Sequence, residues 1–178
     1  MGRAGVSFYV VVRGPLGAGK TAVSRGIASA VRGTHVLIDT ILDDYRLEEW
    51  DEVYISERSF LRANEIAVRQ SAGLLRGGTP VVFDGNFYYR SVVEDLLSRL
   101  DFPHLVVTLK APLATCVARD AQRLPSLGAE AAREVYAIST SFDYGTLIDA
   151  TRPLDEVVLS VLAELRRVGL IGERPGAA

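Results

Sequence analysis

Short apolar runs alternate with longer amphipathic stretches along this chain of 178 residues. The first run, residues 8–12 (FYVVV), is β-branched and aromatic without polar alternation, which is typical of a strand buried on both faces of a parallel sheet. Four further runs predict strands of the same kind, at residues 36–38, 81–83, 105–109 and 146–148.

The stretches between these runs predict helices. We expect them over residues 19–31, 53–76 (one long helix or a broken pair), 91–100, a segment opened by Pro112, 129–140 and 153–168. Glycine ends the first of them at Gly33. Strands that alternate with helices predict the α/β class, with a parallel sheet covered by helices on both faces. We predict one domain over residues 1–171 and a disordered tail over 172–178.

The phosphate-loop pattern G-x-x-x-x-G-K-[ST] lies between the first predicted strand and helix, as GPLGAGKT at residues 14–21. Glycines there let successive backbone N–H groups turn onto phosphate oxygens, beside the positive end of the following helix. Lys20 would reach the outer phosphates of a nucleotide, and the Thr21 hydroxyl would be a ligand of Mg²⁺. We expect the nucleotide to contact Gly14, Leu16, Gly17, Ala18, Gly19, Lys20, Thr21 and Ala22.

Carboxylates follow three of the predicted strands, at the sheet edge where α/β proteins bind ligands. Asp84 ends the run at residues 81–83, as the second metal-orienting residue of a phosphate-loop protein does, and Gly85 and Asn86 beside it could shape a substrate pocket. Asp39 follows the second strand and could orient or deprotonate an attacking hydroxyl, a role for which Asp43 competes. An isolated aspartate after a strand is more often a turn former or helix cap.

Arginines provide candidates for binding anionic groups. Arg119 and Arg123 are four residues apart beside a Pro- and Gly-containing segment, and could neutralise charge on a transferred phosphoryl group; otherwise they are surface residues. Arg46 and Arg90 are weaker candidates near the expected pocket. Both histidines, His35 and His104, stand at strand starts, so we expect structural roles at the opposite edge.

Composition narrows the class of protein. The hydrophobic fraction of 48% and charged fraction of 24% are ordinary for a soluble globular domain, and a net charge of -2 lacks the positive field of a nucleic-acid binder. The single Cys116 cannot form an internal disulfide, which suits a reducing compartment. No apolar segment approaches the ~20 residues of a membrane span. We expect a cytoplasmic protein with no membrane partner.

Together, GPLGAGKT, VVFDGNF, LKAPLATCVARDAQR and FDYGTLIDATRPLDEVV resemble the phosphate-loop small-molecule kinases. That group includes adenylylsulfate, gluconate and shikimate kinases, chloramphenicol phosphotransferase, zeta-toxin type enzymes and the kinase part of polynucleotide kinases. The resemblance implies a five-stranded sheet of order 2-3-1-4-5, a mobile lid carrying Arg119 and Arg123, and ATP as donor. It also implies adenine contacts at Asp149, Ala150 and Thr151.

Departures from the pattern bear on the acceptor. Asp39 is followed by Thr40 and Ile41, whereas adenylylsulfate kinase has two aspartates one position apart. The DDYR run that ends at Arg46 resembles polynucleotide kinases and would make Asp43 the base, but the acidic segment around it would repel a phosphate backbone.

We therefore expect an ATP- and Mg²⁺-dependent kinase acting on a hydroxyl of a small, neutral or cationic metabolite, and a homodimer is the oligomer that we expect. The alternatives are a nucleotide-dependent switch or ATPase acting on a partner, and a nucleoside, nucleotide or polynucleotide kinase. A guanine-reading N-K-x-D motif is missing from the sequence, which favours a kinase over a switch.

Overall fold

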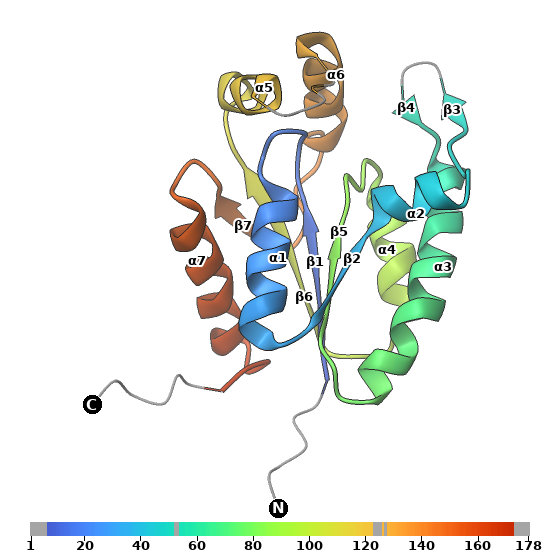
Figure 1. The fold of residues 1–178 in the computed structure, drawn as a ribbon, viewed down its shortest axis with the longest axis vertical. Helices are drawn as coiled ribbons and strands as arrows, with labels where there is room; N and C mark the ends of the chain where they lie inside the picture. Colours follow the sequence, from blue (N-terminus) through green and yellow to red (C-terminus); the bar gives the residue numbers. More distant parts are fainter. Residues whose placement is uncertain (1–6, 52–53, 123–125, 127, 173–178) are drawn as a thin grey trace, which may run out of the picture.

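A computed structural model describes residues 7–51, 54–122, 126 and 128–172 of the chain. Five parallel strands form the main sheet in the order β2-β5-β1-β6-β7 (Figure 1). Since β5 is the third of these five strands along the chain, this is the expected 2-3-1-4-5 order, and the predicted fold class is confirmed. The strands are β1 Tyr9–Arg13, β2 Thr34–Leu37, β5 Val81–Asp84, β6 His104–Lys110 and β7 Thr146–Asp149.

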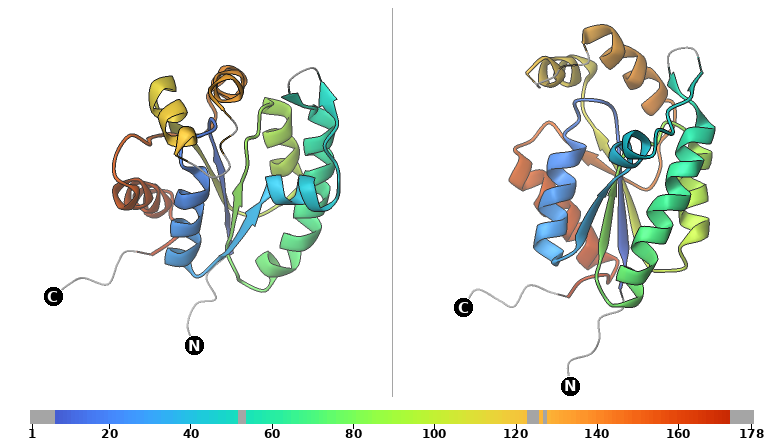
Figure 2. Two further views of the ribbon diagram at one scale, coloured as in Figure 1. Left: turned by 45° about the horizontal axis from the view of Figure 1, so that its top comes forward. Right: turned by 45° about the vertical axis from the view of Figure 1, so that its right-hand side comes forward.

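Helices cover both faces of this sheet. Figures 1 and 2 show α1 (Lys20–Val31) and α7 (Leu154–Arg167) on one face, and α3 (Glu57–Arg76) and α4 (Arg90–Arg99) on the other. Each face has its own apolar core, because successive side chains of a strand point to opposite sides. In β1 the side chain of Val11 packs toward α3 and α4, whereas that of Val12 packs toward α1 and α7.

Smaller elements stand at the carboxyl end of the strands (Figure 2). Helix α2 spans Ile38–Asp44, and a short hairpin of β3 (Trp50–Asp51) and β4 (Tyr54–Ile55) follows it. On the other side of the same edge lie α5 (Leu113–Ala121) and α6 (Ala129–Ser139). These elements surround the candidate site.

Two predicted boundaries are wrong. Residues 36–38 do not form a strand closed by Asp39, because β2 ends at Leu37 and Asp39 lies in the first turn of α2. The predicted helix over 53–76 begins only at Glu57, after the hairpin, because the Ser56 side chain caps α3 by accepting a hydrogen bond from the Ser59 amide at 3.2 Å.

The first helix also ends differently, since Arg32 takes the left-handed conformation (φ 53°) one residue before Gly33. Residues 173–178 of the expected disordered tail lie outside the described part of the chain. Within the described part, no helix is both long and apolar enough to span a membrane.

Candidate active site

The phosphate loop has the backbone shape that its glycines predict. Gly14, Gly17 and Gly19 all have positive φ angles (149°, 80° and 89°), a region that other residues rarely adopt. A Cβ atom at Gly17 would lie 2.2 Å from the carbonyl oxygen of Cys116 in α5. Residue 17 must therefore be glycine both for its conformation and for its close contact with α5.

Lys20 and Thr21 open α1 directly behind this loop. The Lys20 side chain is 8% exposed, and its Nζ donates a hydrogen bond to the Pro15 carbonyl at 3.1 Å, so the ammonium group lies against the loop. Thr21 is half-buried at the amino end of the helix, where the helix dipole favours anions. An anion held by the loop could therefore contact both residues.

A cavity of about 580 Å³ opens above the loop, and we call it the main cavity. It brings together residues from α1, α2, α5 and the loop after β5, most of which the sequence predicted as site residues. Its lining is Leu16, Gly17, Gly19, Lys20, Thr21, Ala22, Arg25, Leu37, Asp39, Thr40, Asp43, Asn86, Arg119 and Asp120. Sequence reasoning missed Arg25, although its position four residues after Thr21 places it one helical turn further along the same face.

The wall opposite the phosphate loop is acidic. Asp39 and Asp43 both line the main cavity, since residues four apart share one face of α2. Tyr88 lies beneath this wall, where burial raises its pKa and the charge of Asp39 raises it further. Its ring packs edge-on against Phe60, 5.1 Å between ring centroids. A packed aromatic pair thus lies close enough to Asp39 to respond to its charge.

Asp84 ends β5 and is fully buried. Its Oδ2 lies 3.2 Å from His35 Nε2, while its Oδ1 has no hydrogen-bond partner within the described residues. The expectation that His35 lies at the opposite sheet edge is therefore corrected, because its side chain reaches the carboxyl end of β5. A buried carboxylate oxygen without a hydrogen-bond partner costs free energy, and it suits a site that a cation or its water ligands complete.

The segment after Asp84 divides between cavity and core. Asn86 lines the main cavity, and its Oδ1 also has no hydrogen-bond partner within the described residues. Gly85 packs against Ile38 and Phe87 instead, 3.0 Å and 3.1 Å from the position of an added Cβ. Phe87 is buried with φ at 43°, a strained conformation for a bulky residue.

Arg119 connects the main cavity to a smaller one of about 230 Å³, which we call the base cavity. Its Nη1 donates a hydrogen bond to the Ala150 carbonyl at 2.8 Å. The base cavity is lined by Ala18, Gly19, Ala22, Val23, Arg119, Ala150, Arg152, Leu154 and Val157. Arg123, the expected partner of Arg119, lies outside the described residues, and α5 ends before it at Ala121.

The predicted adenine loop is only partly at the base cavity. Ala150 lines it, whereas Asp149 and Thr151 line a different surface cavity beside Lys110 and Tyr136. The Asp149 carboxylate accepts hydrogen bonds from the Thr151 hydroxyl (2.6 Å) and amide (2.9 Å), which lower its pKa. Asp149 thus shapes the turn that carries Ala150.

Two expected substrate-binding arginines lie elsewhere. Arg46 is exposed with φ at 51°, and it does not appear among the described residues around the main cavity. Arg90, also missing from that lining, donates to the Asp143 carbonyl at 3.3 Å and lies over the Phe142 and Tyr144 rings. Its aromatic neighbours come from a segment that is distant in sequence, so local pattern could not reveal them.

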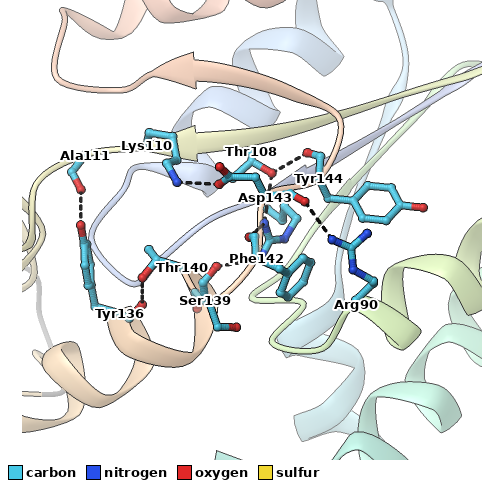
Figure 3. A network of polar contacts seen from close by, with 12 residues as sticks. Arg90, Thr108, Lys110, Ala111, Tyr136, Ser139, Thr140, Phe142, Asp143 and Tyr144 are labelled. Atoms are coloured by element: carbon cyan, nitrogen blue, oxygen red, sulfur yellow. Dashed lines mark hydrogen bonds and ion pairs between the residues drawn. The ribbon is translucent and has the colours of Figure 1, made fainter.

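A third arginine was not predicted at all. Arg13, the last residue of β1, is fully buried and donates hydrogen bonds to the Ser139 carbonyl (2.7 Å), the Phe142 carbonyl (3.2 Å) and the Thr108 hydroxyl (3.1 Å). Burial lowers its pKa to about 10, so it stays charged at neutral pH. Figure 3 shows this polar network, in which Lys110 also pairs with Asp143 at 2.6 Å. The network fixes the end of α6 to β1.

The geometry can be set beside known proteins. A family model described as an AAA domain matches residues 10–137. The chain belongs to this AAA-domain family. Among curated protein sequences, none matches it.

Several solved structures share the fold of this chain at low sequence identity. A gluconokinase from Sinorhizobium meliloti 1021 is 18% identical with a TM-score of 0.72, covering 92% of this chain and 94% of its own. A sugar kinase from Janibacter sp. HTCC2649 is 15% identical with a TM-score of 0.74, covering 94% and 99%. Mycobacterium tuberculosis APS kinase, in complex with AMPPNP and APS, is 14% identical with a TM-score of 0.70, covering 90% and 98%. The predicted resemblance to the phosphate-loop small-molecule kinases is confirmed.

Proposed function

We propose that this protein is an ATP- and Mg²⁺-dependent kinase that transfers the γ-phosphate to a hydroxyl group of a small metabolite. The main cavity carries the proposal, because it sets the phosphate loop with Lys20 opposite the carboxylates of α2. A volume of about 580 Å³ accommodates the reacting ends of two small substrates side by side.

The donor nucleotide would lie along the loop, with its base in the base cavity. Loop amides and Lys20 would hold the phosphates, and Ala150 and Val157 would contact the base. Arg119 borders both cavities, so it would stand beside the phosphate chain and stabilise charge on the transferred group. The APS kinase that shares this fold was solved with the nucleotide analogue AMPPNP, which supports the same mode of donor binding.

Transfer would be a single displacement at the γ-phosphorus. The acceptor oxygen forms a bond to phosphorus while the bond to the β–γ bridging oxygen breaks and ADP leaves, and Asp39 takes the proton of the hydroxyl. Asp43 lines the same wall and is the alternative base. Positioning of the two substrates would supply most of the acceleration.

Magnesium would be held by Thr21 and Asp84, where it supplies positive charge against the developing negative charge of the phosphates. The unpartnered Oδ1 of Asp84 fits this role. Within the described residues, no group of three or more His, Cys, Asp or Glu side chains forms a protein-only metal cage. A site with only one or two protein ligands is typical of Mg²⁺, because this ion keeps several water ligands and also binds the phosphates of the substrate.

The acceptor is proposed from charge. Asp39 and Asp43 favour a neutral or cationic hydroxyl compound over an anionic one. A gluconokinase, a sugar kinase, an APS kinase and a shikimate kinase share the fold, which supports a small polar acceptor. A cytoplasmic location and a homodimer stay predictions.

The test is phosphate transfer from γ-labelled ATP to a pool of polyols, sugars, amino alcohols and nucleosides, with products identified by mass. We expect a labelled small-molecule product that requires Mg²⁺. Release of free phosphate that rises only with an added protein would instead indicate an ATPase acting on a partner, and a labelled nucleoside or oligonucleotide would identify the other kinase classes.

A further inference from the structure

We propose that His35 is a positioning residue, which holds the Asp84 carboxylate in one orientation and leaves Oδ1 for the magnesium ion or its water ligands. This inference rests on the proposed function and adds a residue to it. It starts from two observations: a 3.2 Å contact between His35 Nε2 and Asp84 Oδ2, and an Asp84 side chain with no exposed surface.

Strand pairing explains why these two side chains meet. In the parallel pair β2–β5, His35 lies opposite Val82 and Leu37 lies opposite Asp84. Since alternate residues of a strand share a face, His35 and Asp84 both point to the α1 side, where Val82 packs in the core. The imidazole is long enough to reach diagonally from one strand to the next.

A hydrogen bond from His35 would orient the Asp84 carboxylate. A metal-binding carboxylate is ionised and only accepts hydrogen bonds, so the proposal places a proton on Nε2, which donates to Oδ2. The last torsion of an aspartate side chain is broad, and a hydrogen bond to one oxygen is what selects its orientation. Within the described residues Oδ1 has no such bond, so His35 alone fixes this carboxylate through a side chain. Partners of metal-binding side chains act in this way.

Access to His35 comes from outside the main cavity. A neighbouring cavity of about 420 Å³ is lined by His35 together with Arg25, Thr34, Thr40 and Gln70. The His35 side chain is 17% exposed there, while Asp84 is not exposed at all. The histidine can therefore be replaced, or supplemented by free imidazole, without direct change to the walls that contact phosphate.

The main experiment measures the magnesium dependence of phosphate transfer at saturating ATP. His35→Leu removes the donor, and we expect the Mg²⁺ concentration for half-maximal rate to rise about 10- to 100-fold, while KM for the acceptor stays unchanged. His35→Gln puts an amide nitrogen where Nε2 was and should recover most of the loss. His35→Asn has the same polarity but does not reach Asp84, so it should behave like the leucine variant.

His104 is a matched control, because it is the only other histidine and lies at the start of β6. Its Nδ1 contacts the Phe102 carbonyl at 3.1 Å, and its ring stacks on Tyr9. His104→Leu should leave the Mg²⁺ dependence unchanged. In the His35→Ala variant, added imidazole should restore magnesium affinity, whereas in His104→Ala it should not change it.

A double-variant cycle shows whether His35 acts through Asp84. Mg²⁺-dependent binding of a non-hydrolysable ATP analogue is measured for His35→Gln, His35→Asn, Asp84→Asn and the two combinations. With Asp84 present, we expect His35→Gln and His35→Asn to differ in magnesium affinity. With Asp84→Asn, we expect the two His35 variants to have the same magnesium affinity. Equal magnesium affinity of the two variants with Asp84 present would overturn the proposal for His35 without contradicting the proposed kinase function. Failure of the unaltered protein to bind the analogue with Mg²⁺ would instead overturn the proposed function.

Discussion

The two walls of the main cavity are built in different ways. The wall that we propose to bind the donor nucleotide, the donor wall, is one continuous stretch, residues 14–21, whose shape follows from positive-φ glycines and the start of α1. The wall that we propose to face the acceptor, the acceptor wall, is assembled from α2 and from Asn86, which are separated by the whole of α3. A local motif can therefore reveal what the donor wall binds, whereas the acceptor depends on contacts between distant segments.

The strongest test of the donor wall is Lys20→Ala. We expect kcat to fall about 10³-fold, since the ammonium group stabilises charge on the transferred phosphate. The other lysine, Lys110, pairs with Asp143 at the surface, so Lys110→Ala is the control and should retain activity. Steady-state kinetics measures kcat for both variants, and thermal unfolding shows whether each variant is still folded. Equal kcat for Lys20→Ala and the native protein would remove Lys20 from the mechanism.

The acceptor wall is tested by Asp39→Asn and Asp43→Asn, which control for each other. Loss of the base should lower kcat about 10²-fold with little effect on ATP binding. We expect this for Asp39→Asn, and for Asp43→Asn a higher KM for the acceptor instead, because its carboxylate lies one helical turn away. Steady-state kinetics with the identified acceptor decides which of the two aspartates is the base. The reverse pattern would assign the base to Asp43.

Gly17→Ala probes the long-range contact between the donor wall and α5. Its Cβ would lie 2.2 Å from the Cys116 carbonyl at a positive φ, so we expect a loss of about 3 kcal/mol in unfolding free energy and weaker ATP binding. Gly19 has a similar φ of 89° but nothing within 4 Å of an added Cβ, so Gly19→Ala should lose only about 1 kcal/mol. Denaturant titration compares them, and equal losses would show that α5 does not press on the loop.

The smallest effect is expected at the turn that carries Ala150. In Thr151→Val the hydroxyl donor to Asp149 is lost, so the pKa of this carboxylate should rise toward its ordinary value. Because the folded-state pKa is lowered, its contribution to stability is present above the unfolded-state pKa and is lost as pH falls through the folded-state value. A carboxyl NMR titration measures the change, with Thr140→Val as control, since that hydroxyl donates to a backbone carbonyl. An unchanged Asp149 pKa would contradict the assignment.

Much of the fold could be predicted from local pattern. The strand order followed from the resemblance, and the buried strands were recognisable because a parallel sheet covered on both faces needs continuous apolar runs. The hairpin before α3 was missed because each of its strands has two residues, too few for a period to emerge. Asp39 was predicted to close the second strand, but β2 ends at Leu37 and α2 begins at Ile38. A change from strand to helix within one residue leaves no pattern that would reveal it.

The candidate site was predictable where one motif determines it. Lys20, Thr21, Asp39 and Asp43 all line the main cavity as expected. Arg46 and Arg90 do not, because exposed arginines take their direction from neighbours that only the folded chain supplies. His35 was placed at the wrong sheet edge for a similar reason: its partner Asp84 is 49 residues away and meets it only through strand pairing.

Arg13 fixes the carboxyl end of α6 to the main sheet. Its guanidinium group ties the end of α6 to the strand that leads into the phosphate loop, at the Ser139 and Phe142 carbonyls. Breaking both bonds would strand a buried cation, which costs several kcal/mol. Any movement of α6 that keeps these two bonds must therefore leave its carboxyl end, at Ser139, fixed to the last residue of β1.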